Sequence, residues 1–291
     1  MGRSGLGRRT VVQALGAWAL AGGAPPLGSL AGLALAQAAA QDQVVDGFAA
    51  DTVKRLAQQL AQRPYSKPRI ELPEPYNKLT YDQYRDIRFR ADQAIWRGEA
   101  LDYELQLFAM GYLYDVPVEI WIVVGSRARL LRADSTVFSI GPLVGSAPQA
   151  APFGFSGFRI HGPLNRSDVL DEYVVFQGAT YFRAVGRGQS YGLSARGLAI
   201  NVAKPPGEEF PLFRGFWIEK PKKGAPELVV HALLDSPSTA GAYRMSIQPG
   251  AAVVMDIDAT LFPRREMPHV GLAPLTSMFL HGPASRRVNG D

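Results

Sequence analysis

From Tyr103 onward the chain is a succession of short runs rich in Val, Ile, Tyr and Phe, and this pattern constrains the fold most strongly. The first runs are "YELQLFAM", "VPVEIWIVVG" and "EYVVFQGATYFRAVG", and Gly, Pro and Asp separate them. Five more follow: "GLAINVA", "FRGFWIEK", "PELVVHALLD", "GAYRMSIQPG" and "AAVVMDIDATLF". Such runs are typical of β-strands, and they do not alternate with helices as in a doubly wound sheet. The sequence therefore predicts a mainly β, mostly antiparallel body.

Two short helices are expected before this body. Residues 48–60 carry apolar side chains near helical spacing, with Asp46 or Asp51 to cap the helix and Pro64 to stop it. The segment "TYDQ" at residues 80–83 fits the capping-box pattern for a second helix that continues through "YRDI". The proline-rich segment between them, "YSKPRIELPEPYNK", is predicted to be extended.

The N-terminus carries the features of an export signal. Arg8 and Arg9 precede an apolar run rich in Ala and Gly, and "ALAQ" offers small residues to signal peptidase. Residues 1–36 are therefore predicted to be a twin-arginine signal, read by the twin-arginine translocase, and the mature protein is expected in the periplasm. Glycines and a Pro-Pro pair interrupt the run before the roughly 18 apolar residues that a membrane span requires. We expect no stable membrane insertion.

Charge and residue counts exclude several classes of function. The formal net charge is +5, and three arginines lie in the acid-free leader, so the remainder carries about 5 − 3 = +2. A net charge this small gives little electrostatic reason to expect nucleic-acid binding. There are no cysteines, and the four histidines form no i, i+4 pair, so we expect no metal site and no cofactor. The segments "GRGQSYG" and "GLSARG" miss the spacings of a phosphate loop and a nucleophile elbow, and the first is predicted to be a turn.

Residues 176–201, "FQGATYFRAVGRGQSYGLSARGLAIN", combine rings, arginines and five glycines in strand-like sequence. Glycine in a strand suggests bulges, tight turns or the close approach of a ligand or another backbone. Strand alternation places Tyr181 and Arg183 on one face and Phe182 on the other. Rings beside guanidinium groups suit a flat polar ligand such as a sugar, with core or sheet packing as the alternative. The candidate substrate-binding residues are Tyr181, Arg183, Tyr191, Arg196, Phe216 and Trp217.

Three carboxyl groups are the candidates for catalysis. Glu208 and Glu209 lie in "GEEFP" at a loop-to-strand junction, and Asp235 lies in "LLDSP" at a strand end. Hydrolysis of a glycosidic bond needs two carboxyl groups, one of them with a raised pKa so that it can protonate the leaving oxygen. The alternative for all three is a solvated loop acid or a turn cap.

Several blocks together resemble one family over residues 66–282. They are "LTYDQYRDIRFR", "FSGFRIHGPLNRSDVLDEYVVFQGATYFRAVGRGQSYGLSARGLAI", "GEEFPLFRGFWIEKP", "ALLDSPSTAGAYR" and "GLAPLTSMFLHGP". The resemblance is to the periplasmic glucan biosynthesis proteins of Gram-negative bacteria, which act on osmoregulated periplasmic glucans. The twin-arginine leader favours their D type over the G type.

The resemblance implies a large antiparallel β-sandwich similar to galactose mutarotase, followed by an immunoglobulin-like domain. It also implies a β-1,2-linked glucose backbone as ligand and similarity to inverting glycoside hydrolases. We expect a helix and linker over residues 37–65 and the sandwich over residues 66–291. A non-catalytic glucan-binding or scaffolding protein is the main alternative, and a mutarotase-type epimerase is a weaker one.

The chain departs from the family pattern at its end. It stops at "RRVNGD", before an acid-rich segment in which the resemblance implies the general acid. The last sheet strands and the second domain are also expected beyond Asp291. The sequence therefore predicts a fragment or truncated product that does not hydrolyse glucan by itself.

Overall fold

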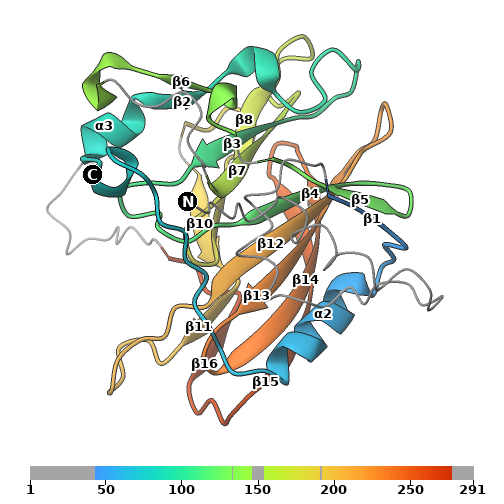
Figure 1. The fold of residues 1–291 in the computed structure, drawn as a ribbon. Helices are drawn as coiled ribbons and strands as arrows, with labels where there is room; N and C mark the ends of the chain where they lie inside the picture. Colours follow the sequence, from blue (N-terminus) through green and yellow to red (C-terminus); the bar gives the residue numbers. More distant parts are fainter. Residues whose placement is uncertain (1–42, 133, 146–153, 191, 277–291) are drawn as a thin grey trace, which may run out of the picture.

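The computed structural model describes residues 43–132, 134–145, 154–190 and 192–276, and two large β-sheets form the body of this part (Figure 1). A seven-stranded sheet has the strand order β1-β5-β4-β12-β13-β14-β15. Its strands are β1 (Val44–Asp46), β5 (Arg127–Leu130), β4 (Glu119–Val124), β12 (Leu212–Glu219), β13 (Leu228–Asp235), β14 (Thr239–Gln248) and β15 (Val254–Pro263).

The second sheet has five strands in the order β10-β9-β8-β7-β3. These are β10 (Leu193–Arg196), β9 (Tyr181–Ala184), β8 (Asp171–Gln177), β7 (Phe155–Gly162) and β3 (Glu104–Ala109). Two further pairs join β11 (Leu198–Ile200) to β16 (Val270–Leu272) and β2 (Ile87–Phe89) to β6 (Phe138–Ile140). Among the strand pairs of the described residues only β4–β12 is parallel. The prediction of a mainly β, antiparallel sandwich is confirmed, and the likeness to galactose mutarotase stays a prediction.

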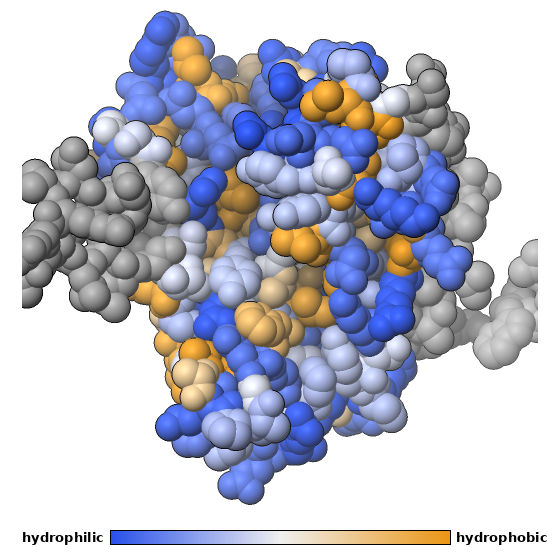
Figure 2. Space-filling view, turned by 90° about the vertical axis from the view of Figure 1, so that its left-hand side faces the viewer, coloured by the Kyte–Doolittle hydropathy of each residue, from blue (hydrophilic) through white to orange (hydrophobic). Residues whose placement is uncertain are grey.

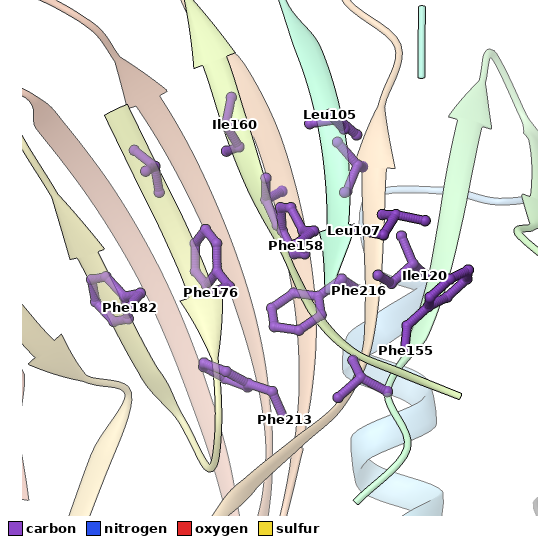
Figure 3. Close-up of a cluster of buried hydrophobic side chains, with 14 of the residues drawn as sticks. Leu105, Leu107, Ile120, Phe155, Phe158, Ile160, Phe176, Phe182, Phe213 and Phe216 are labelled. Atoms are coloured by element: carbon purple, nitrogen blue, oxygen red, sulfur yellow. The ribbon is translucent and has the colours of Figure 1, made fainter. Parts of the chain in front are cut away.

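The larger hydrophobic core fills the space between the two sheets (Figure 3). Phe216 from β12 meets Phe158 from β7 and Phe176 from β8, with ring centroids 5.0 and 5.4 Å away. Phe158 and Phe176 stack on each other at 5.0 Å. Burial of one such side chain stabilises the fold by about 1.5–3 kcal/mol, so these rings hold the two sheets together.

The helices form close to where the sequence predicts them, although the second ends at Arg85 and Ile87 already begins β2. Helix α2 (Thr52–Ala61) begins after Asp51, whose carboxylate pairs with Arg55 and makes no capping hydrogen bond. Helix α3 (Tyr81–Arg85) has the complete capping box: the Thr80 hydroxyl accepts from the backbone N–H of Gln83 at 3.3 Å, and the Gln83 side chain accepts from the backbone N–H of Thr80 at 2.9 Å. Short 3₁₀ turns are η1 (Tyr76–Lys78), η2 (Ala91–Gln93), η3 (Ser135–Val137) and η4 (Pro142–Val144). Neither α-helix of the described residues has the length and apolar character needed to span a bilayer.

A second, smaller core lies between α2 and the outer face of the seven-stranded sheet. Val53, Ala57 and Leu60 form one face of α2 and pack on this sheet. Beneath them the indole rings of Trp121 and Trp217 stack, with centroids 6.0 Å apart and planes 8° apart. The part of the chain that the structure describes therefore has three layers: helix, seven-stranded sheet and five-stranded sheet.

The glycine-rich segment serves turns and close backbone contacts, as predicted. Gly178 has φ +75° in the turn between β8 and β9, a conformation that favours glycine. At Gly192 a Cβ atom would lie 2.2 Å from the carbonyl oxygen of Ala184, so glycine is needed for β9 and β10 to approach. The predicted alternation is also confirmed, since Phe182 is buried while Arg183 is exposed.

Candidate functional site

The strongest candidate site surrounds Asp235, at the C-terminal end of β13. Its side chain is 0% exposed. The Nη1 atom of Arg214 lies 2.7 Å from one carboxylate oxygen, and Nη1 of Arg264 lies 2.9 Å from the other. A buried carboxylate is costly unless it is paired, and here two guanidinium groups provide the pairing. We call the surrounding residues the Asp235 cluster: Tyr65, Glu209, Arg214, Asp235, Ser236, Ser238, Arg264 and Arg265.

Local backbone features place the two arginines. Arg214 stands where the register between β12 and β13 shifts, in an irregularity between Phe213 and Gly215. Such a bulge re-aims a side chain, and Arg214 points to Asp235. Arg264 follows β15 and also donates to the carbonyls of Leu60 and Arg63 at 2.7 and 3.1 Å, at the end of α2. The helix terminus and the buried acid therefore share one arginine.

Electrostatics at Asp235 are a balance of burial and pairing. Burial raises the pKa of Asp235, and the charges of Arg214 and Arg264 oppose this effect without cancelling it. A carboxyl group perturbed by burial together with specific charge partners is a candidate functional group.

Glu209 is the second carboxylate of the cluster and has the opposite shift. Ser238 donates to it twice, from its backbone N–H at 2.9 Å and its hydroxyl at 2.7 Å, and Arg265 lies 3.1 Å away. Burial would raise the pKa of Glu209, but hydrogen bonds from Ser238, Ser236 and Arg265 outweigh it and lower this pKa. Burial and the charge of Asp235 together raise the pKa of Tyr65, and Glu209 adds to this, so the phenol lies near both acids.

Glu208 belongs to a neighbouring group. It forms an ion pair with Arg196, which also lies over the rings of Tyr181 at 5.6 Å and Phe210 at 5.9 Å. Phe210 is half exposed. A guanidinium group between two rings gains a cation–π interaction and leaves aromatic surface available to a ligand. The adjacent positions of Glu208 and Glu209 join this group to the Asp235 cluster.

A cavity of about 160 Å³ lies beside these groups. Its wall includes Tyr181, Leu212 and Phe216, together with Gln177 and Lys67. Leu212 is the direct cross-strand partner of Asp235, so their Cα atoms are about 5 Å apart. The cavity thus borders the Asp235 cluster, and its wall mixes aromatic, amide and cationic side chains, as in small-molecule sites.

The predicted substrate-binding residues are divided among several places. Tyr181 and Arg196 lie at the cavity and beside it. Phe216 is 2% exposed and forms both core and cavity wall, and Trp217 is 6% exposed beneath α2, where packing accounts for its position. Arg183 lines a different cavity of about 290 Å³ with Glu172 and Gln189. Tyr191, Arg8 and Arg9 lie outside the described residues.

Sequence reasoning missed one carboxyl group, Glu119. It begins β4 and accepts a hydrogen bond from the indole N–H of Trp121 at 3.1 Å. Burial raises the pKa of Glu119 to about 7, although the Trp121 bond and the charge of Arg214 oppose the shift. A single acid in a strand that reads as apolar gives no signal in the sequence.

Among the described residues no group of three His, Asp or Glu side chains is placed to bind a metal ion.

Comparison with known proteins identifies the family. A sequence model described as "Periplasmic glucan biosynthesis protein, MdoG" matches residues 48–291. The chain belongs to this family. The family description places its members in the periplasm, which agrees with the predicted location.

Members with similar sequences are named glucans biosynthesis protein G. One from Vibrio cholerae serotype O1 is 51% identical over 244 residues, covering 84% of this chain and 45% of the relative. One from Shewanella frigidimarina is 50% identical over 244 residues, covering 84% of this chain and 44% of the relative. One from Shewanella sp. strain ANA-3 is 49% identical over 262 residues, covering 89% of this chain and 48% of the relative. The chain spans about half the length of these relatives.

The predicted subtype requires a correction. The leader favoured the D type, whereas these relatives, about half identical to this chain, carry the name of the G type. The prediction of the D type from the leader was therefore wrong, because the similarity to proteins named for the G type extends over 84–89% of this chain.

Proposed function

We propose that this chain supplies the glucan-binding sandwich of a protein that shapes the β-1,2-linked glucose backbone of osmoregulated periplasmic glucans. We further propose that the full-length protein does so by inverting hydrolysis. The observation that carries this proposal is the fully buried Asp235, held by two arginines about one strand spacing from the cavity. Family membership supplies the glucan as the ligand class.

In this mechanism Asp235 is the general base. An inverting hydrolase needs an ionised carboxylate to take a proton from the attacking water, and a second carboxyl group about 6.5–9.5 Å away to protonate the leaving oxygen. Burial raises the pKa of Asp235, which makes its carboxylate a stronger base, while Arg214 and Arg264 favour the ionised form that accepts the proton. Glu209 holds Ser238 and Arg265 in place and acts as a positioning residue. The general acid is expected outside residues 1–291, as the resemblance implies.

The sugar would lie against Tyr181, Arg196 and Phe210. The two rings are partly exposed, and the guanidinium group between them is fixed by Glu208. Aromatic faces bury the apolar face of a pyranose, and the guanidinium donates to its hydroxyl groups.

One observation favours the alternative, a non-catalytic glucan-binding or scaffolding protein. Both oxygens of Asp235 contact a guanidinium group, and a purely structural ion pair has the same contacts. Binding without turnover is the expected behaviour under this alternative.

Hydrolysis and binding should be measured separately. We suggest fusing this chain to the C-terminal half of the Vibrio cholerae relative and assaying reducing ends released from β-1,2-glucan. The proposal predicts turnover by the fusion, its loss in Asp235→Asn with binding retained, and no turnover by residues 1–291 alone. Binding by a fusion that has no turnover would favour the scaffold, and turnover by residues 1–291 alone would contradict the expected place of the general acid.

A further inference from the structure

Four tyrosines gather around α3 and the turn that follows β3. We call Tyr81, Tyr84, Tyr112 and Tyr114 the tyrosine platform. Tyr112 lies 5.8 Å from Tyr81 and 6.3 Å from Tyr84 between ring centroids, and Tyr84 lies 5.4 Å from Tyr114. The rings of Tyr84 and Tyr112 are nearly parallel, at 28°. Figure 2 views the molecule from the side on which α3 lies, where apolar patches alternate with hydrophilic residues around a hollow.

Core packing does not explain the outer half of this platform. Tyr81 is 54% exposed and Tyr112 is 42% exposed, and Leu113 between the tyrosines is also exposed. Tyr112 has φ +54°, in the left-handed region that aromatic residues rarely adopt. Such backbone strain costs of order 1–3 kcal/mol and concentrates at functional sites. An exposed ring held in a strained conformation is therefore better explained by a ligand than by folding.

The inner half of the platform is fixed. The hydroxyl of Tyr84 donates to the carbonyl of Ala109 at 3.0 Å and accepts from the side-chain amide of Gln177 at 2.7 Å. Gly178 leaves just enough space for Tyr114, since a Cβ atom at Gly178 would lie 3.1 Å from that ring. The capping box fixes the start of α3 and hence Tyr81. Rigid rings lose little entropy when a ligand stacks on them.

The platform opens into the cavity described above. Leu113, Tyr114, Gln177 and Gly178 line one part of its wall, and Tyr181 and Leu212 line another. One cavity therefore extends from Tyr114 of the platform to Tyr181 and to Leu212, the cross-strand neighbour of Asp235.

Two cations near the platform are engaged by neighbouring side chains. Arg85 lies over the ring of Tyr81, and Lys67 at the cavity pairs with Asp115 at 3.1 Å. Burial raises the pKa of Tyr84 to about 12, so its hydroxyl is neutral.

We propose that the tyrosine platform is a distal glucan-binding site, at which pyranose rings of the same chain stack before it enters the cavity. The ligand class rests on the proposed function, whereas the location rests on the exposed and strained rings. The platform would hold units remote from the bond that is cut and would favour long glucans over short ones.

The test is calorimetric titration of long and short β-1,2-linked gluco-oligosaccharides into the 291-residue chain and its variants. Tyr112→Gly removes a ring and relieves the left-handed strain. We expect about tenfold weaker binding of the long oligosaccharide, an unchanged affinity for the short one, and a melting temperature equal to or above that of the wild type. Tyr81→Ala should weaken binding similarly, and Tyr81→Phe, which keeps the ring, should bind as the wild type does. Val254→Ala, an exposed apolar position on β15, is the control.

Two results would overturn the proposal by giving the platform another role. One is a Tyr112→Gly variant with a lower melting temperature and unchanged affinity, which would make the platform structural. The other is loss of self-association in this variant during sedimentation, which would make it a contact between copies. If the wild type binds β-1,2-glucan and the platform variants bind equally well, the platform fails and the proposed function stands. If the platform binds only glucans of other linkages, the proposed function fails instead.

Discussion

Replacing Glu119 with Gln tests the electrostatic description of the sheet most sharply. Burial beside Trp121 raises the pKa of this carboxyl group from its ordinary 4.5 to about 7. One pH unit corresponds to 1.36 kcal/mol, so the difference between about 7 and 4.5 corresponds to about 3 kcal/mol. Glutamine keeps the shape and the acceptor oxygen and removes the titration.

The sign follows from linkage. Because the pKa of Glu119 is higher in the folded state than in the unfolded state, the folded state binds its proton more tightly. Its contribution to stability is complete below about pH 4.5 and is lost as the pH rises through about 7. Relative to Glu119→Gln, the wild type should therefore lose about 3 kcal/mol of unfolding free energy between these limits.

Urea unfolding of both proteins at about pH 4.5 and pH 8 measures this difference. Effects of other groups cancel because only the difference between the two proteins is compared. Glu266→Gln, at an exposed position, controls for the general loss of a carboxylate. If the wild type and Glu119→Gln show the same pH dependence, the pKa of Glu119 is not raised in the folded state and the reasoning is refuted.

Three further predictions concern export, packing and the buried ion pair. Arg8→Lys with Arg9→Lys should keep the protein in the cytoplasm, because the translocase reads the arginine pair, and cell fractionation checks this. Trp217→Ala should lower the unfolding free energy by about 3–5 kcal/mol while the folded variant binds glucan normally, because the ring lies in the core under α2. Asp235→Ala should cost about 3–5 kcal/mol in chemical denaturation, because it leaves two buried guanidinium groups without their counter-charge.

Local patterns predicted the elements well. The apolar runs correspond to β3, β4, β8, β9 and β11 to β15, and "TYDQ" forms the capping box of α3. Strand alternation placed Phe182 and Arg183 on opposite faces, because period-two patterning needs no knowledge of distant residues, and the structure buries the first and exposes the second. The predicted runs did not include the eight-residue strand β7, nor the strands β1, β2, β5, β6 and β16, which have three or four residues and are too short to show a pattern.

Long-range arrangement could not be predicted in the same way. Helix α2 packs over Trp217, which lies more than 150 positions later in the sequence. The contact of Arg264 with the end of α2 also joins residues more than 150 positions apart. The tyrosine platform likewise combines residues 81–84 with residues 112–114. Only the tertiary structure brings such side chains together, and no local sequence pattern indicates these contacts.

The central claim is that the cavity beside Asp235 binds a β-1,2-linked glucan, and a calorimetric titration tests it directly. A β-1,2-linked gluco-oligosaccharide is titrated into the 291-residue chain and into Tyr181→Ala, with a β-1,4-linked oligosaccharide of equal length as the control ligand. We predict saturable binding of the β-1,2 ligand by the wild type, about tenfold weaker binding by Tyr181→Ala, and weaker binding of the β-1,4 ligand. No measurable binding of the β-1,2 ligand, or equal affinity in the wild type and Tyr181→Ala, would contradict the claim.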